Sequence, residues 1–130
     1  MYQATTHDIR VTVEPQFMND RSLPEQSRYF WAYTIEIANL GRGVVQLRSR
    51  YWRITDGRGH VEEVRGPGVI GKEPVLQPGE SFTYTSGCPL TTPSGIMTGS
   101  YQMERPGGAT FDVIVPAFSL DSPYDVKRVN

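Results

Sequence analysis

Several features that mark other classes of protein are scarce in this chain. Cys88 is the only cysteine, so no intramolecular disulfide can form and the chain suits a reducing compartment. The formal net charge is -1, whereas a general nucleic-acid binder is usually strongly basic, so we expect no nucleic-acid partner. No apolar run approaches the ~18 residues of a membrane span, and residues 1–8 lack the basic and apolar segments of a secretory signal. We expect a cytoplasmic protein without membrane insertion.

Uninterrupted helical stretches are absent too, because 13 glycines and 10 prolines divide the chain into short segments. Within these segments apolar and polar residues alternate, which is the period of a half-buried β-strand. The first strand should end at Glu14-Pro15, since proline cannot donate to a ladder. The predicted strands are Ile9–Val13, Arg28–Leu40, Val44–Thr55, His60–Val64, Ser81–Ser86, Met97–Met103 and Phe111–Ala117.

Turn residues join these strands. Asp56-Gly57 predicts a tight hairpin with a type I′ turn, and residues 39–43 predict a turn that would make the flanking strands neighbours. Seven or eight short strands joined by Gly/Pro turns are typical of an all-β, immunoglobulin-like or fibronectin type III-like antiparallel β-sandwich. A length of 130 residues fits one domain over residues 1–130, with residues 1–6 and 120–130 least firmly held.

The core of such a sandwich must rest on hydrophobic burial, since the usual inter-sheet disulfide is impossible with one cysteine. Exposed edge strands would also allow a dimer by sheet pairing, although nothing in the sequence requires one, so the oligomeric state is left open. The predicted core residues are Trp31, Tyr33, Ile35, Phe82, Tyr101, Met103, Phe111, Val113 and Val115.

The stretch Gly66-Pro67-Gly68-Val69-Ile70-Gly71 has the G-x-G-x-x-G spacing of a dinucleotide-binding loop. Such a loop lies between a buried parallel strand and a helix whose N-terminus faces the phosphates. Here residues 60–65 are too polar for a strand buried on both faces, and Pro74 and Pro78 disfavour a following helix. The spacing alone therefore does not indicate a dinucleotide site.

Motifs spread along the chain together resemble one family. With the region around Val13 and Glu14, they resemble the ApaG family, also called CorD, over nearly the whole chain. The resemblance implies a fibronectin type III-like β-sandwich. The motifs are Trp52-Arg53-Ile54-Thr55-Asp56-Gly57, the glycine stretch 66–71, Leu76-Gln77-Pro78-Gly79-Glu80, Tyr84-Thr85-Ser86-Gly87-Cys88, Thr91-Thr92-Pro93-Ser94-Gly95 and Met97-Thr98-Gly99-Ser100-Tyr101-Gln102-Met103.

The resemblance implies less about activity. Bacterial members are linked to cobalt resistance and magnesium efflux and are often encoded beside a hydrolase of diadenosine tetraphosphate. Similar domains end some eukaryotic F-box proteins and a polymerase-delta-interacting protein, where they look like partner-binding modules. The resemblance supplies no catalytic residues.

The first candidate binding region is a strand rich in arginine and aromatic residues. Arg48, Arg50 and Trp52 share one face by period two, with Tyr51 and Arg53 beside them. Residues 42–65 hold six arginines against three carboxylates, a local charge of +3. Arginine among aromatic rings can stack on bases, clamp phosphates or meet an acidic protein partner, and a solvated strand face is the plain alternative.

The second candidate region is the loop formed by Gly66, Pro67, Gly68, Val69, Ile70, Gly71 and Lys72. Its exposed shape could dock a protein. Alternatively, successive N–H groups together with Lys72 could hold a phosphate without any helix. A structured connector with glycine at positive φ is the plain alternative.

No metal site, catalytic site or cofactor is predicted. The histidine–carboxylate pairs are His7 with Asp8 and His60 with Glu62, whereas a transition-metal site needs three or four converging ligands. We expect Cys88 to be a small buried hydrophobe, and no serine lies in a G-x-S-x-G context.

Taken with the resemblance, these patterns predict a non-enzymatic protein-interaction domain, linked to cobalt resistance and magnesium efflux through a protein partner. The alternative is a small-ligand sensor that binds a nucleotide or pyrophosphate, with or without a divalent metal, at the loop of residues 66–72. The sensor requires successive N–H groups and Lys72 to face a phosphate.

Overall fold

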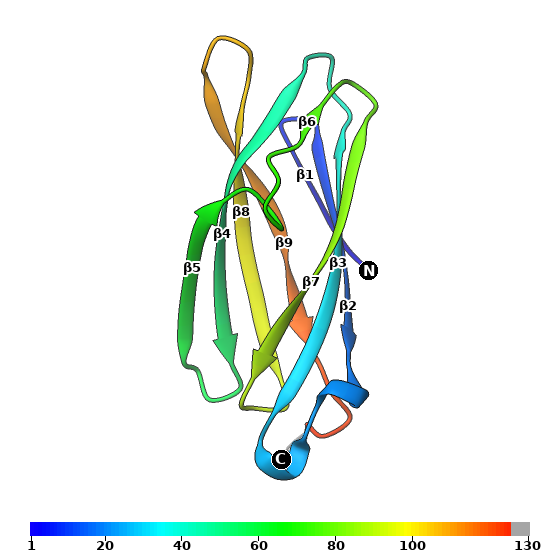
Figure 1. Cartoon of the computed structure of the whole chain (residues 1–130), viewed down its shortest axis with the longest axis vertical. Coiled ribbons are helices and arrows are strands. Elements are labelled where there is room, and N and C mark those ends of the chain that lie inside the picture. Colours follow the sequence, from blue (N-terminus) through cyan, green and yellow to red (C-terminus); the bar gives the residue numbers. More distant parts are fainter. Residues whose placement is uncertain (126–130) are drawn as a thin grey trace.

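A computed structural model of the chain describes residues 1–125 and has the form of an antiparallel β-sandwich (Figure 1). Two one-turn 3-10 segments, η1 (Asn19–Arg21) and η2 (Pro24–Gln26), are the helical elements of this part. No helix within these residues has the length and apolar character needed to cross a bilayer. The predicted fold class is confirmed. The strands are β1 (Tyr2–Thr6), β2 (Ile9–Phe17), β3 (Tyr29–Asn39), β4 (Val45–Asp56), β5 (Val61–Pro67), β6 (Val75–Leu76), β7 (Ser81–Leu90), β8 (Gly95–Glu104) and β9 (Thr110–Leu120).

The two sheets close on one side and stay open on the other. One sheet has the order β1-β2-β3-β7, and the other has the order β5-β4-β8-β9 with β6 paired to the start of β4. On one side β9 packs against β1 and β2. On the opposite side the sheets end at the edge strands β7 and β5, which have no comparable packing against each other.

Inward-facing side chains of both sheets form the core. Seven of the nine predicted core residues are buried, and the other two, Phe82 and Phe111, are partly buried and pack against the core. Trp31 is 1% exposed, and its indole N–H donates to the carbonyl oxygen of Asp121 at 2.7 Å. The core's tryptophan on β3 therefore keeps its one polar atom hydrogen-bonded.

Both ends of the described chain contact the sandwich. Residues 1–6, expected to be loosely held, contribute β1, which pairs with β2 along its whole length. Beyond β9, the Ser122 hydroxyl donates to the carbonyl oxygen of Pro93 at 2.6 Å. Residues 126–130 of the expected C-terminal flank lie outside the described part.

Strand β2 continues through Pro15 to Phe17, so the predicted end at Pro15 is wrong. The reason is that β1 pairs with β2 only from Ile9 to Val13, whereas β3 pairs with it as far as Phe17. Pro15 therefore lies where one side of β2 has no partner strand, and a missing N–H is tolerated there.

Strands β3 and β4 belong to opposite sheets, so the prediction that they are neighbours is wrong. The chain crosses between the sheets after Asn39, whose side chain is buried. The Nδ2 of Asn39 donates to the carbonyl oxygens of Gly43 at 2.9 Å and Leu76 at 3.0 Å, and its Oδ1 accepts from the N–H of Gly41 at 3.0 Å. One amide side chain thus fixes a crossing that a turn pattern alone does not distinguish from a hairpin.

The hairpin between β4 and β5 is confirmed, but its turn is not type I′. Neither Gly57 nor Arg58 has a positive φ, whereas Gly59 has a φ of 86°. The Asp56 carboxylate accepts from the N–H groups of Arg58 at 2.8 Å and His60 at 3.0 Å. The aspartate therefore stabilises the turn through its side chain.

A β-bulge changes the inward face of β9. Opposite Met97–Gly99 of β8, β9 carries one extra residue between Val115 and Phe118. Phe118 is consequently buried, and Ala117, which continued the predicted alternation, is exposed.

Gly99 of β8 leaves no room for a side chain against β4, since a Cβ there would lie 2.5 Å from the carbonyl oxygen of Tyr51 and 2.6 Å from the Trp52 ring. We expect Gly99→Ala to lower the free energy of unfolding in urea by about 1–3 kcal/mol through overpacking. The matched control is Gly43→Ala, whose Cβ would meet nothing within 4 Å and whose effect should stay below about 0.5 kcal/mol. Equal effects of the two substitutions would contradict this packing.

Candidate functional site

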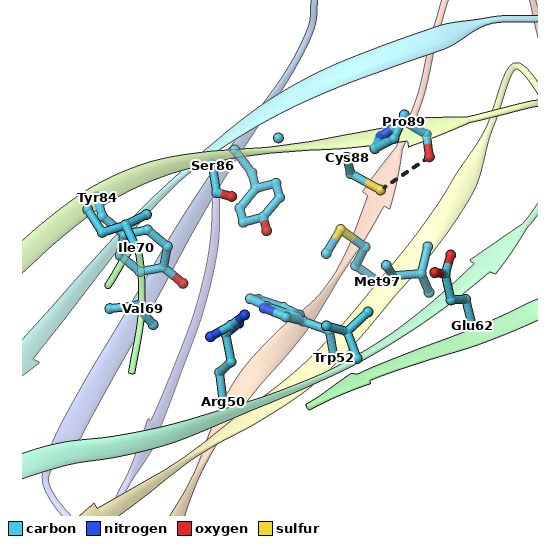
Figure 2. Close-up of a pocket in the computed structure, with 14 residues that line it drawn as sticks. Arg50, Trp52, Glu62, Val69, Ile70, Tyr84, Ser86, Cys88, Pro89 and Met97 are labelled. Carbon is cyan, nitrogen blue, oxygen red and sulfur yellow. Dashed lines mark hydrogen bonds between the residues drawn. The ribbon is translucent and has the colours of Figure 1, made fainter. Parts of the chain in front are cut away.

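A pocket of about 390 Å³ lies at the open side of the sandwich, between β7 of one sheet and β4 and β5 of the other (Figure 2). The loop of residues 66–72 contributes Val69 and Ile70 to it. Most of the wall is apolar or aromatic, and the polar groups are few. The main lining residues are Tyr33, Trp52, Ile54, Val64, Tyr84 and Met97, with Arg50, Glu62, Ser86 and Cys88 as the polar ones.

A β-bulge in β4 decides which of its side chains enter this pocket. The register against β8 shifts by one residue between Leu47 and Ser49. After the shift Arg50 and Trp52 face inward, whereas Arg48 lies exposed on the outer face. The prediction that Arg48, Arg50 and Trp52 share one face is therefore wrong, because period two holds only along a regular ladder.

Arg50 connects β4 to the loop of residues 66–72. Its Nη1 donates to the carbonyl oxygens of Pro67 at 2.9 Å and Gly68 at 3.1 Å. Gly66 pairs with Arg50 across the two strands, and a Cβ at Gly66 would lie 3.0 Å from the guanidinium carbon. Within residues 1–125 Arg50 forms no ion pair. The guanidinium therefore holds the loop through one nitrogen and has further donors for a ligand in the pocket.

Tyrosine hydroxyls surround this end of the pocket. Tyr84 and Tyr101 share a hydrogen bond of 2.5 Å between their hydroxyl oxygens. Burial raises the pKa of Tyr33, Tyr84 and Tyr101, and the positive charge of Arg50 opposes this only in part at Tyr33 and Tyr84. All three phenols therefore stay neutral near pH 7, and Tyr33 and Tyr84 line the pocket, whereas Tyr101 lies buried behind Tyr84.

Cys88 lies on β7 and is 3% exposed. Burial, and then the negative charge of Glu62, raise the pKa of its thiol to about 11. The thiol is thus protonated near neutral pH, and the protonated form is a poor nucleophile. The prediction of a buried cysteine is confirmed.

The loop ends in a tight turn. The N–H of Val69 donates to the carbonyl oxygen of Lys72 at 2.8 Å, and the N–H of Lys72 donates back to Val69 at 2.9 Å. Both residues between them have positive φ, with 44° at Ile70 and 77° at Gly71. This is the conformation of a type I′ turn.

Ile70 is an unusual residue for that conformation. A β-branched side chain is a steric outlier at positive φ, and asparagine or glycine normally occupies the first central position of a type I′ turn. The side chain of Ile70 is nevertheless 53% exposed at the pocket that Tyr84 also lines (Figure 2). Strain of this kind often lies at binding sites, and here it displays an apolar group to solvent.

The loop offers few N–H groups to a phosphate. Gly68 donates to the carbonyl oxygen of Arg48 at 2.8 Å, and Val69 and Lys72 donate to each other. Phosphate cradles use several successive N–H groups, usually at a helix N-terminus, and here the chain continues into β6.

The other residues of the predicted binding strand separate into core and outer face. Trp52 is 4% exposed, and its ring packs edge-on against those of Tyr33 and Tyr101. Tyr51 and Arg53 point to the outer face, away from the pocket. The structure therefore brings together Arg50, Trp52 and the loop, but not Arg48, Tyr51 or Arg53.

Carboxylates outside residues 42–65, one on β8 and one in the segment before β6, pair with Arg48 and offset part of the predicted local charge of +3. The Nε of Arg48 lies 3.2 Å from the Glu104 carboxylate and 3.5 Å from that of Glu73. The Tyr51 hydroxyl donates to Glu63 at 2.7 Å, and this hydrogen bond raises the pKa of Tyr51. Neither of the two acids that pair with Arg48 lies in residues 42–65. The charge count of that segment therefore does not include these ion-pair partners.

Residues 1–125 contain no group of three or more histidine, cysteine or acidic side chains close enough to hold a metal ion. His60 lies next to Asp56 instead, with 3.9 Å between its Nδ1 and the carboxylate. The pair is exposed on the histidine side and lies outside the pocket.

Known proteins resemble this chain in sequence and in fold. The family model described as ApaG domain matches residues 19–105. The chain belongs to the ApaG family. Protein ApaG of Methylorubrum populi is 64% identical over 129 residues, which cover 99% of this chain and 98% of that protein. Protein ApaG of Brucella anthropi is 58% identical over 130 residues, all of both chains.

A crystal structure of an ApaA protein from Bordetella pertussis resembles this ApaG-family chain with a TM-score of 0.87. The two are 45% identical, and the match covers 93% of this chain and 98% of the other. The resemblance predicted from the sequence motifs is therefore confirmed, and the β-sandwich is shared with a relative of known structure.

We expect Ile70→Asn to stabilise this ApaG-family chain by about 0.5–1 kcal/mol, because asparagine tolerates positive φ. The control is Ile96→Asn on β8, where the side chain is 52% exposed and φ is not positive. That control should be neutral or destabilising, since asparagine disfavours strands. Thermal unfolding measures both, and a destabilised Ile70→Asn would contradict the strain assigned to this turn.

Proposed function

We propose that this ApaG-family chain is a non-enzymatic, cytoplasmic binding module that captures a protein partner. Its contact surface is the pocket between β5 and β7, with the loop of residues 66–72 at the rim. The observation that carries the proposal is Ile70, an apolar side chain held exposed in a strained turn beside the pocket. Exposure of this residue costs stability, and a partner that buries it would offset that cost.

The composition of the pocket supports a protein partner. Aromatic residues and arginine dominate the energetics of protein interfaces, and here Arg50, Trp52 and Tyr84 line one cavity. A volume of about 390 Å³ leaves room for side chains of a partner between the sheets.

The chemistry of the pocket favours binding over catalysis. Its cysteine carries a thiol whose pKa is raised to about 11, so it is not a thiolate near pH 7. No histidine is among the residues that line it, so no imidazole is placed to activate Ser86 or Cys88.

A role in cobalt resistance and magnesium efflux would then be indirect, through the partner. The lack of a metal-binding cluster in residues 1–125 supports this route over intrinsic metal binding. The alternative, a nucleotide or pyrophosphate sensor at the same loop, has Arg50 and Lys72 as its cations. It is less well supported, because the N–H groups of Gly68, Val69 and Lys72 already donate within the chain.

Photo-crosslinking tests the proposal. We expect p-benzoylphenylalanine at position 70 to form a discrete adduct with one cellular protein, because the pocket rim contacts the partner. The matched control places it at Ile96, which is equally exposed but lies on β8 outside the pocket. Arg50→Gln should weaken the adduct at position 70, and Arg53→Gln should not.

Identical adduct patterns at positions 70 and 96 would contradict the proposal. Loss of the position-70 adduct should coincide with cobalt sensitivity of cells that carry Arg50→Gln. Cobalt resistance that survives without the adduct would separate this pocket from metal homeostasis.

A further inference from the structure

We propose that the partner binds by strand addition: an extended segment of its chain pairs with the free edge of β7 and places an acidic side chain against Arg50. This inference rests on the proposed function and specifies how the same pocket is occupied. Three observations support it. The outer edge of β7 has free backbone hydrogen-bonding groups, most of β7 lacks the charged residues and proline that protect edge strands, and the two ends of the pocket carry opposite charges.

The outer edge of β7 has free backbone groups. In the described chain β7 pairs with β3 alone. The carbonyl oxygen of Glu80 accepts from the N–H of Asn39 at 2.9 Å, so even-numbered residues here face β3. Pro89, which has no N–H, is one of the odd-numbered residues, which face away from β3. Thr83, Thr85 and Gly87 therefore direct their N–H and C=O groups to the open edge.

This edge lacks the usual protection against pairing. Proteins guard exposed edges with charges, proline, bulges or short strands. β7 is ten residues long, its pairing with β3 is regular, and residues 81–88 contain no charged residue and no proline. The opposite edge strand, β5, carries Glu62, Glu63 and Arg65. An unguarded edge thus borders the pocket on one side only.

A separate chain fits this edge better than a second copy of the protein. Two copies could pair β7 with β7, but Tyr84 and Cys88 of each copy already pack in that copy's own core. They could not fill the pocket of the other copy. An extended partner segment can, because every second side chain of an added strand points to the same face.

The charges in the pocket predict the chemistry of the segment. Arg50 has no carboxylate partner within residues 1–125 and lies opposite Gly66 of β5. Glu62 lies four residues from Gly66 along β5, a distance of about 13 Å for a strand. Trp52 and Met97 line the wall between them. A segment with an aspartate or glutamate at the Arg50 end and an apolar residue two positions away matches this order.

A displayed library of random ten-residue peptides, selected on the purified chain, supplies the probe. We expect selected peptides to carry an acidic and an apolar residue at positions i and i+2. Synthetic versions should shift the NMR amide signals of Thr83, Thr85 and Gly87. Backbone N-methylation at alternate peptide residues should weaken binding at least tenfold, and N-methylation at the intervening residues should change it less than twofold.

Substitutions at Thr85 separate the edge from the side chain. Thr85→Pro removes an edge N–H without removing a bond to β3, and we expect at least tenfold weaker peptide binding. Thr85→Ala is the matched control, since both variants lose the hydroxyl contact with Thr34 but alanine keeps the N–H. It should change affinity less than twofold. If Thr85→Pro does not fold, the N-methylated peptides make the same distinction.

Substitutions at Arg50 test the acidic contact. Arg50→Gln should lower the affinity for the selected peptides at least fivefold. It should leave unchanged the affinity for peptides in which glutamine replaces the acidic residue. Arg53→Gln, on the same strand but on the outer face, should leave both unchanged. Equal losses with both peptides would remove the acidic contact from the proposal.

The outcomes distinguish this inference from the proposed function. Peptides that bind the pocket but tolerate Thr85→Pro and N-methylation would overturn strand addition and leave partner capture intact. A selection that yields no binding peptide, while position 70 still crosslinks a cellular protein, would likewise overturn strand addition and leave partner capture intact. Protection of β7 amides in a dimer of the free protein would assign the edge to a second copy. Failure of both selection and crosslinking would overturn the proposed function as well.

Discussion

One extra residue in β4, between Leu47 and Ser49, determines the character of the pocket. Before the bulge the strand contributes Leu47 to the core, and after it the inward positions are those of Arg50 and Trp52. A guanidinium thereby enters a pocket whose wall is mostly apolar or aromatic. Without the bulge, Ser49 and Tyr51 would face inward and Arg50 would join the solvated outer face.

Neighbouring groups satisfy part of the hydrogen-bonding capacity of the Arg50 guanidinium. Its Nη1 donates to two loop carbonyls, and Gly66 leaves room for the guanidinium. These contacts turn the loop carbonyls toward the protein, while the type I′ turn pushes Ile70 outward. The same arrangement therefore supports the loop, lines the pocket and exposes an apolar side chain at its rim.

The open side of the sandwich gives this pocket its access. β9 seals the other side against β1 and β2, but β5 and β7 remain separate edges. A binding site between two edge strands combines backbone hydrogen bonding with side-chain recognition, which are the two components of strand addition. Catalysis would need a nucleophile and a base, and the raised pKa of Cys88 leaves the pocket without an activated thiol.

Regular alternation made most of the fold predictable from the sequence. It identified β3 and β8 and seven buried core residues, because a half-buried strand must place every second side chain inward. It failed at the bulges of β4 and β9, where one added residue reverses the inward face. The crossing after Asn39 was missed because its side-chain hydrogen bonds join distant segments.

The candidate site was predictable only in part for the same reason. Residue type alone singles out the loop and Arg50, whereas Trp52 lines the pocket only with the part of its ring that the core leaves uncovered. The carboxylates that pair with Arg48 come from Glu73 and Glu104, which are distant in sequence. Tyr33 and Tyr84, the pocket tyrosines on the facing sheet, are marked in the sequence as a core residue and as part of a family motif, and neither pattern places them at a pocket.

The central claim is that the glycine-rich loop supports a polypeptide-binding pocket and does not cradle phosphates. An amide-resolved NMR titration with ATP and diadenosine tetraphosphate, each with and without Mg²⁺ or Co²⁺, tests it most directly. We predict no saturable shifts in residues 66–72 up to millimolar nucleotide, because the donors of Gly68, Val69 and Lys72 face the protein. Saturable shifts clustered on those residues would contradict the account and establish a nucleotide sensor.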